Sequence, residues 1–315
     1  GIVHIAPGHG DDDYNLGIKN GVDIIQTVQD DGRYNHHAKG FENEHIYKVD
    51  DKIAEKLKEF SKLLFKGTLR HSYPHSWRSK APLIYRNTPQ WFISMEKNKL
   101  RDIALKSIDE TVFYPPQGQT RLRSMIETRP DWCVSRQRVW GVPLPLFVSK
   151  ETGQPLRDLE VVERIADIYE EEGSDTWFTE DPQRFLGEKY NLEDYDQVKD
   201  VVEVWFDSGS THAFCLEKRE DLKWPASMYL EGSDQHRGWF HSSLLESSGT
   251  RGRAPYESVL THGFVVDGKG RKMSKSLGNV ISPDDILKKY GVDILRLWVV
   301  ASDYYDDLKL DNNIL

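Results

Sequence analysis

The stretch Met228-Tyr229-Leu230-Glu231-Gly232-Ser233-Asp234-Gln235-His236 decides the fold. It opens on apolar residues that predict a buried strand, and the strand runs directly into a polar loop. The periodicity of residues 237–248 predicts a helix of about a dozen residues. Residues 258–261 predict a further strand, which ends at His262. Strand, polar loop, helix and strand in this order form the unit of a parallel, doubly wound sheet.

Polar side chains gather where the predicted strands end. The run 201–206 predicts another buried strand, which ends at Asp207. In open parallel sheets, ligands bind beyond the carboxyl ends of the strands. The residues expected at those ends are Asp207, Glu231, Gly232, Asp234, Gln235, His236 and His262. Groups of this kind are costly to bury and stabilise a fold poorly, so the sequence predicts a binding site at this edge of the sheet.

The rest of the chain is mixed. Near the start we expect a short strand at 2–5 that enters a turn at 7–10 and an acidic run at 11–13, and then a helix at 50–64. An irregular hinge at 71–78 and a strand at 89–93 should follow. Further along, we expect a helix at 158–172 and an acidic surface insertion at 173–197. The opening residues contain neither a signal peptide nor an initiator Met, so we expect a truncated chain.

Composition excludes several classes of protein. Hydrophobic residues make up 38% and charged residues 30% of the 315 residues, as in ordinary globular proteins. No apolar run approaches the roughly 20 residues needed to span a bilayer, so we expect no membrane partner. The net charge of −9 argues against nucleic-acid binding by the whole surface, although basic residues concentrate in 70–101 and 121–138.

The cysteines give no sign of a metal site. Cys133 and Cys215 lie far apart and neither belongs to a CxxC pair, so neither a zinc cluster nor an obligatory disulfide is supported. A reducing, cytoplasmic setting fits this usage best.

The string Lys272-Met273-Ser274-Lys275-Ser276 is the most specific chemical signal. Glycines on both sides predict a mobile loop, and its cations suit a polyphosphate. Departure of pyrophosphate from ATP builds negative charge, which a lysine on such a loop can stabilise in the transition state. Downstream, Ser282-Pro283-Asp284-Asp285 predicts a helix start with Ser as the N-cap.

The lysine string matches the signature of class I aminoacyl-tRNA synthetases, and much of the chain resembles isoleucyl-tRNA synthetases. The strings that carry this resemblance lie at 71–78, 88–92, 129–141, 204–212, 229–240, 260–264 and 293–302. The resemblance implies an α/β fold that contains the second half of a doubly wound, Rossmann-type parallel sheet. It implies the tail of a β-rich editing domain at 1–72 and catalytic residues at 73–276, with an acidic insertion near 155–200. Residues 277–315 would begin a helical, stem-contacting segment that leads to an anticodon-binding domain outside the chain.

The resemblance also implies residue roles in nucleotide binding. Glu231, Gly232 and Asp234 would hold the adenylate, and His262 would lie near the adenine or the phosphates. A helix-capping or core histidine is a fair alternative for His262. Lys275 would be the catalytic cation, with Lys272 in support.

For the amino acid, the resemblance places Gln235 beside the carboxylate. It places Trp140 and Trp239 around the isoleucine side chain, although ordinary aromatic core packing is an equal alternative for either one.

A second set of residues resembles the end of the family's editing pocket. In the string 3–14, His4 and Asp13 would hold a mischarged aminoacyl ester while water cleaves it. The carboxylate would pair with the free ammonium of the amino acid. Editing is needed because one missing methylene discriminates poorly between isoleucine and valine, and isoleucyl-tRNA synthetase is itself the standard example of this limit.

The implied function is ATP-dependent attachment of isoleucine to tRNA(Ile) through isoleucyl-adenylate, with Mg²⁺ accompanying the ATP, by a monomeric enzyme. The family's His-x-Gly-His string does not occur here, so we expect this chain alone to be inactive. The alternatives are a valyl- or leucyl-tRNA synthetase, or a non-catalytic binding module. A nucleotidyltransferase without tRNA is disfavoured by the editing-type segment.

Overall fold

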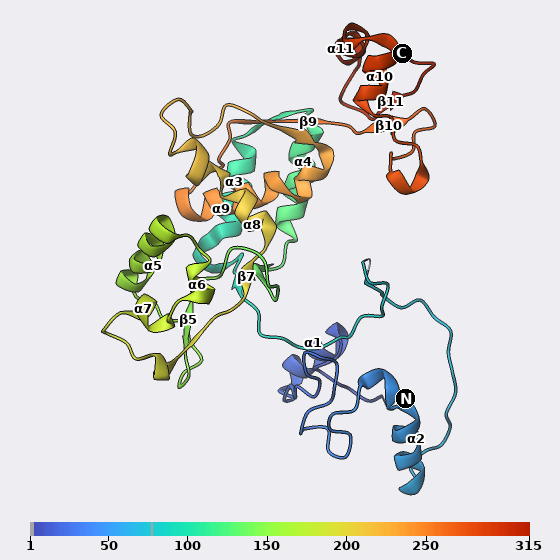
Figure 1. Cartoon of the computed structure of the whole chain (residues 1–315), viewed down its shortest axis with the longest axis vertical. Coiled ribbons are helices and arrows are strands. Elements are labelled where there is room, and N and C mark those ends of the chain that lie inside the picture. Colours follow the sequence, from blue (N-terminus) through green and yellow to red (C-terminus); the bar gives the residue numbers. More distant parts are fainter. Residues whose placement is uncertain (1–2, 77) are drawn as a thin grey trace. The chain divides into compact units, whose positions relative to one another are not determined.

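The computed structural model describes residues 3–76 and 78–315. The chain divides into two compact units, Gly1–Pro89 and Gln90–Leu315, and each is described by itself (Figure 1). The predicted strand at 2–5 includes Ile2 and the predicted hinge at 71–78 includes Trp77, and both residues lie outside the described ones. The domain boundary at residue 72 stays a prediction.

The first unit contains short helices joined by irregular segments. They are α1 (Asp11–Asn20), the 3₁₀ helix η1 (Ile46–Lys48) and α2 (Asp50–Glu59). The acidic run at 11–13 forms the first turn of α1, where carboxylates favour the helix dipole. The predicted helix at 50–64 ends five residues early. The described residues of the first unit form isolated bridges but no strand. The predicted strand at 2–5 is therefore wrong over its described residues, because no described segment pairs with them.

The second unit is built on a parallel sheet. Strand β9 (Ser258–His262) lies between β2 (Val112–Tyr114) and β8 (Tyr229–Gly232), and all of them run parallel. The helices α3 (Leu100–Asp109), α4 (Gln117–Glu127) and α9 (Trp239–Arg251) pack around this sheet (Figure 1). Their shared core includes Ile108, Leu122, Phe240, Leu244 and Val259. The predicted α/β fold with a parallel sheet is therefore confirmed.

The predicted strand at 201–206 is wrong beyond its first residues. Strand β7 is only Val201–Val202, which pairs antiparallel with β4 (Ser135–Arg136), and the helix α8 (Val204–Gly209) follows at once. The apolar run indicated a buried strand as far as residue 206, but Val204 is 69% exposed and does not belong to the core. Helix α8 instead packs against α9.

The predicted helix at 237–248 begins and ends slightly later, as α9. The side-chain oxygen of Gln235 accepts a hydrogen bond from the backbone N–H of Trp239 at 2.8 Å, which satisfies a free donor at the helix start. At the other end, Gly252 adopts a left-handed conformation (φ 74°) that closes the helix.

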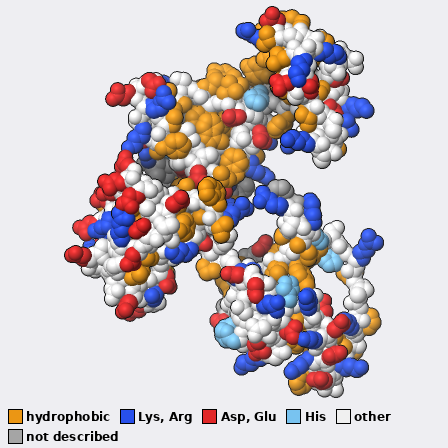
Figure 2. Space-filling view, in the orientation of Figure 1, with side chains coloured by type: hydrophobic (Ala, Val, Ile, Leu, Met, Phe, Trp, Pro, Cys, Tyr) orange, Lys and Arg blue, Asp and Glu red, His pale blue; other side chains and the backbone are white. Residues whose placement is uncertain are grey.

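The acidic insertion has a core of its own. Its elements are β5 (Phe147–Ser149), α5 (Leu159–Glu172), α6 (Thr176–Thr179), α7 (Pro182–Leu186), η3 (Leu192–Asp194) and β6 (Tyr195–Gln197). Helix α5 matches the predicted helix, and Asp158 caps its first turn. Trp177, Phe185 and Leu186 are fully buried together, so the segment has a small core of its own beneath a surface rich in charged side chains (Figure 2).

The C-terminal elements follow the sheet. Strand β10 (Val265–Asp267) pairs parallel with β11 (Leu308–Leu310), and between them lie η6 (Lys275–Leu277), α10 (Pro283–Tyr290) and α11 (Val292–Ala301). Ser282 accepts from the backbone N–H of Asp285 and donates to its carboxylate, which confirms the predicted helix start.

The remaining elements are β1 (Phe92–Ile93), paired with β3 (Trp132–Cys133), the 3₁₀ helices η2 (Lys97–Lys99) and η5 (Ser233–Arg237), and the π-helix η4 (His212–Leu216). Across the described ranges, every helix is too short or too polar to cross a bilayer.

Helix α9 is buried from Phe240 to Ser248, and it carries a carboxyl group into the interior. Glu246 lies against Gly209 of α8, and its Oε1 has no hydrogen-bond partner within the described chain. Burial, reinforced by the negative charges of Asp207 and Glu203, raises the pKa of the Glu246 carboxyl to about 9.

We therefore predict that Glu246→Gln reduces the pH dependence of stability. Between the ordinary pKa of 4.5 and the folded pKa of about 9, the folded state holds a proton that the unfolded state has lost. The wild-type free energy of unfolding should then fall with rising pH by at most about 1.4 kcal/mol per unit. The glutamine variant lacks this fall. Its free energy of unfolding relative to wild type should therefore increase from pH 5 to pH 8, as measured by urea titrations. The exposed Glu220→Gln is the matched control, and parallel pH profiles for Glu246→Gln and wild type would contradict the assignment.

Candidate functional site

The parallel register brings polar groups together at one edge of the sheet. Gly232 and His262 are paired residues at the carboxyl ends of β8 and β9. A cavity of about 580 Å³ opens there, lined among others by Ser233, His236, His262 and Tyr305. Its position agrees with the rule that ligands bind beyond the carboxyl ends of parallel strands.

Two backbone features shape this cavity. Helix α4 starts three residues after β2, and its first turn carries no acidic residue and no side-chain cap. A Cβ on Gly263 would overlap the backbone of Asp306, so only glycine lets residues 304–308 approach the end of β9. The cavity therefore lies between the start of α4 and the 304–308 segment.

His236 contributes a buried nitrogen at the start of α4. Its side chain is almost fully buried, Nδ1 lies 3.0 Å from the carbonyl oxygen of Ser233, and Nε2 has no partner among the described residues. A Cβ on Gly118 would lie 3.0 Å from that Nε2. Burial lowers the pKa of the His236 imidazole, which keeps the ring neutral at neutral pH. Because the Ser233 carbonyl oxygen only accepts, Nδ1 carries the proton of the neutral ring, and Nε2 is left as a hydrogen-bond acceptor.

The other residues predicted on this edge divide between the cavity and other positions. Glu231 and Asp234 are exposed beside the cavity and do not line it. The oxygen of Gln235 is engaged at the start of α9, which leaves its amide nitrogen free for another partner. Nδ1 of His262 lies 2.8 Å from the carbonyl oxygen of Gly263, and this histidine does line the cavity.

The tryptophans are arranged differently from the predicted pair. Trp239 stacks on Tyr229 with ring centroids 4.0 Å apart and donates from Nε1 to the carbonyl of Ser208 at 2.9 Å. Trp205 lies beside the same segment, because a Cβ on Gly238 would be 2.9 Å from its ring. Trp140 is 87% exposed, and its ring has no aromatic contact among the described residues. The structure therefore groups Trp205, not Trp140, with Trp239. Sequence reasoning missed Trp205 because it read residues 201–206 as one strand.

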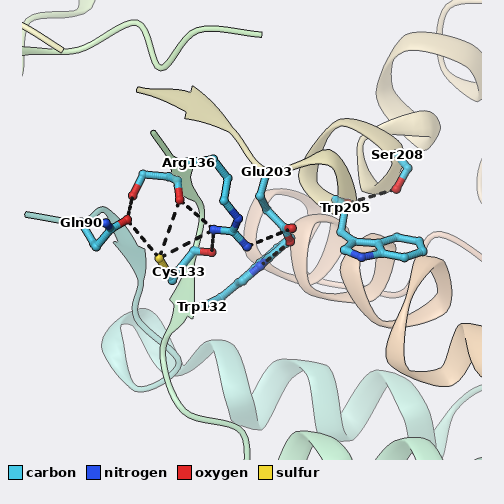
Figure 3. A network of polar contacts seen from close by, with 8 residues as sticks. Gln90, Trp132, Cys133, Arg136, Glu203, Trp205 and Ser208 are labelled. Carbon is cyan, nitrogen blue, oxygen red and sulfur yellow. Dashed lines mark hydrogen bonds and ion pairs between the residues drawn. The ribbon is translucent and has the colours of Figure 1, made fainter. Parts of the chain in front are cut away.

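A buried polar network holds the start of α8 (Figure 3). The Glu203 carboxylate accepts from Trp132 Nε1 at 2.9 Å and from Arg136 Nη2 at 3.2 Å. Arg136 also donates to the carbonyl groups of Cys133 and Ser135. Ser135 in turn donates to the side-chain oxygen of Gln90 at 2.7 Å. These hydrogen bonds connect Gln90 and the segment 132–136 to the start of α8, the helix that contains Trp205.

The lysine string lies on an ordered loop after β10. Ser274 caps η6 by accepting from Leu277, and Gly278 ends it in a left-handed conformation (φ 63°). Lys272 and Lys275 are exposed, and neither forms an ion pair within the described part of the chain. Their ammonium groups are therefore open to an anionic ligand, although neither lysine lines the cavity.

The first unit has a separate cavity of about 820 Å³, which His4 lines together with His9, Tyr34 and Tyr85. His9 Nε2 lies 2.8 Å from Thr27 Oγ1 and its Nδ1 lies 3.0 Å from the carbonyl of Tyr85. Asp13 does not line this cavity; its carboxylate accepts from the backbone N–H of Ala6 at 2.8 Å and so holds the segment that follows His4. No cluster of His, Cys, Asp and Glu suited to a metal occurs among the described residues of either unit.

We predict that Glu203→Ala destabilises the second unit by about 2 kcal/mol, because it leaves the Trp132 N–H and the Nη2 group of Arg136 without their acceptor. Glu203→Gln keeps one acceptor oxygen and should cost less. Urea unfolding of both variants, with the exposed Glu160→Ala as control, measures the difference. Equal stability of Glu203→Ala and the control would show that the network does not hold α8.

Comparison with known proteins agrees with this geometry. The family model for class I tRNA synthetases (I, L, M and V) matches residues 19–311. An isoleucine–tRNA ligase of Pelagibacter ubique is 68% identical over the whole chain, and one of Gluconobacter oxydans is 53% identical. The chain covers 35% and 34% of their lengths, so it spans about a third of these curated relatives.

Among solved structures, the methionyl-tRNA synthetase of Mycobacterium tuberculosis in complex with methionyl-adenylate has a TM-score of 0.48 and 19% identity, covering 78% of this chain and 40% of that one. This similarity is too low to add to the assignment. The match to the family model over nearly the whole sequence is sufficient, and the chain belongs to the class I tRNA synthetases of the I, L, M and V group.

Proposed function

We propose that this chain is part of an isoleucine–tRNA ligase and contributes the second half of its ATP-binding catalytic domain. The observation that carries the proposal is the cavity beyond the carboxyl ends of β8 and β9, in a member of the class I synthetases. The 68% identity with a relative named as an isoleucine–tRNA ligase supports isoleucine as the amino acid.

The proposed reaction joins isoleucine to AMP before it reaches tRNA(Ile). A carboxylate oxygen of isoleucine bonds to the α-phosphorus of ATP, the bond from that phosphorus to the bridging oxygen breaks, and pyrophosphate leaves with the electron pair. Lys275, supported by Lys272, stabilises the charge that builds on the departing group. A ribose hydroxyl of the tRNA then displaces AMP from the adenylate. Mg²⁺ accompanies the ATP phosphates, and we assign no residue of this chain to it because the described residues offer no suitable cluster.

The cavity residues suit a nucleotide. His262 and the neutral His236 offer ring nitrogens, and Arg121 of α4 adds a cation to the lining. Gly232 allows close approach of the ligand to the backbone. Glu231 and Asp234, exposed beside the cavity, would accept hydrogen bonds from ribose hydroxyls.

For the amino acid, the free amide nitrogen of Gln235 would bind the carboxylate. Trp239 would line the side-chain pocket, and the position of Trp205 beside it supports a role for that ring as well. Trp140 remains a prediction from the family resemblance and gains no support from its exposure.

The first unit would belong to an editing domain that hydrolyses valine from mischarged tRNA(Ile). His4 lines its cavity, and Asp13 holds the adjoining backbone. At the other end of the chain, the helix α11 exposes apolar side chains, among them Leu297 and Val300. This supports the proposal that residues 277–315 continue into a helical domain. We propose a cytoplasmic, monomeric enzyme.

The test of the function is ATP–pyrophosphate exchange by the complete parent protein, assayed with each amino acid in turn. We expect strong exchange with isoleucine and weaker exchange with valine, because the two differ by one methylene. Exchange with valine or leucine alone would move the protein to a neighbouring specificity. No exchange with any amino acid would favour a binding module.

We predict that Lys275→Ala in the parent protein lowers kcat for isoleucine-dependent exchange by about a hundredfold or more, because it removes a cation that acts on the developing charge. The binding of isoleucine should not change. Lys288→Ala, at an exposed lysine of α10, is the control and should leave kcat intact. A loss of the same size in both variants would refute the catalytic role of Lys275.

We predict that Asp13→Ala abolishes hydrolysis of Val-tRNA(Ile) by the parent protein while isoleucine activation is retained. The substitution removes both the carboxylate and the hydrogen bond that holds Ala6 beside His4. Deacylation and pyrophosphate exchange are measured on the same preparation, with the exposed Asp12→Ala as control. Deacylation at the wild-type rate in Asp13→Ala would rule out the proposed editing role.

A further inference from the structure

The lysine loop is closed by a pair of side chains that the proposed mechanism does not use. Asp267 ends β10 before the loop, and Asn279 follows η6 after it. The Nδ2 of Asn279 donates to Asp267 Oδ2 at 2.9 Å and to the carbonyl of Lys272 at 3.2 Å. Its Oδ1 accepts from the backbone N–H of Ser274 at 2.9 Å. One amide thus joins the start, the middle and the end of the loop.

Asp267 organises the first half of the loop in the same way. Its Oδ1 accepts from the backbone N–H groups of Lys269 and Arg271, at 3.0 and 2.8 Å. Its Oδ2 accepts from Arg271 Nε at 2.9 Å. The hydrogen bond from Asn279, followed by those from Arg271, lowers the pKa of the Asp267 carboxyl below its ordinary value, so it stays ionised.

The base of the loop is attached to the two-stranded pair of β10 and β11. Asp267 is buried and paired with Leu310 across β10 and β11, and Val266 forms an antiparallel bridge with Lys272. A Cβ on Gly268 would overlap the carboxylate of Asp311. The backbone on both sides of Lys272 is therefore held while its ammonium group, like that of Lys275, points to no anionic side chain within the described residues.

We propose that Asp267 and Asn279 form a clasp that positions the lysine loop for the departure of pyrophosphate. The inference rests on the proposed function, because it concerns the step in which Lys272 and Lys275 act. Neither clasp residue touches the reacting groups. They act by fixing the backbone from which the lysines extend, so that less ordering of the loop remains for the transition state.

The first test measures kinetics in the complete parent protein. Asn279→Ala should lower kcat for isoleucine-dependent exchange about ten- to a hundredfold, with the KM for ATP within about twofold, because the lost positioning matters in the transition state. Asn312→Ala is the matched control: it removes an exposed asparagine that contacts Lys289 and Tyr290, outside the loop. A rise in KM without a fall in kcat, or an equal loss in both variants, would overturn the proposal.

An exchange of the two side chains separates positioning from general damage. Asn279→Asp alone places two carboxylates together and should be at least as harmful as Asn279→Ala. In the double variant Asp267→Asn/Asn279→Asp, one amide again faces one carboxylate across the loop. The exchange restores the contact between positions 267 and 279 but not the hydrogen bonds to the Lys272 carbonyl and from Arg271 Nε. We therefore expect a kcat above that of either single variant but below that of wild type, and hence non-additivity. A double variant no better than the worse single one would contradict the clasp.

Amide hydrogen exchange tests the clasp without reference to activity. In the parent protein, Asn279→Ala should accelerate exchange in residues 268–279, where the amides of Lys269, Arg271 and Ser274 are donors to the clasp, and Asn312→Ala should not. If exchange in 268–279 is unchanged, the clasp does not exist. If it accelerates while the wild-type protein shows no pyrophosphate exchange with any amino acid, the clasp stands and the proposed function fails.

Discussion

The parallel pairing of β8 with β9 is the constraint on which the rest of the second unit depends. Its register sets Gly232 beside His262 and brings the polar loops after both strands to one edge. The same pairing requires a crossover, and α9 supplies it. Because α9 is buried from Phe240 to Ser248, its position and that of the strands determine each other. The cavity at this edge follows from the topology, and its lining residues come from segments far apart in the sequence.

The polar groups of the second unit have two distinct tasks. Glu203 and Asp267 are bonded to the backbone or to buried side chains, and each holds an element in place. Lys272 and Lys275 are exposed and have no anionic partner among the described residues. This division is physically sensible, since a group that must bind a ligand gains from being unpaired, and a group that supports it gains from being fully paired.

The proposed function gives the two cavities opposite chemical steps. A site that forms an aminoacyl bond by displacing pyrophosphate needs cations near a nucleotide, which the second unit supplies on its loop. The cavity of the first unit is lined mainly by apolar side chains, with His4, His9 and Asp23 among its polar ones, and the proposed hydrolysis of an ester would take place there. Under the proposed function, separate cavities would keep the hydrolytic step from undoing the synthetic one.

The sequence by itself determined those features whose signals are local. The strands that became β8 and β9, the capped start of α10 and the lysine string could be recognised because capping, turn residues and short apolar runs act over a few residues. Long motif strings were equally sufficient for the family, which the match over residues 19–311 confirmed. The sequence also predicted the polar residues at the ends of β8 and β9, whereas Asp207, expected at the end of a third strand, lies inside α8. The individual roles of these residues stay predictions.

Only the tertiary structure decided the rest. The apolar run does not show that Val202 is in a strand and Val204 in a helix. This difference depends on the segments that pack against them, because β7 pairs with β4 and α8 packs against α9. It was likewise the fold that placed Trp205 beside Trp239, gave the acidic insertion its own core and joined Asp267 to Asn279 across the loop. These outcomes depend on contacts between residues that are distant in the sequence. Such contacts stabilise the fold only after the chain has lost the conformational entropy of closing the intervening loops.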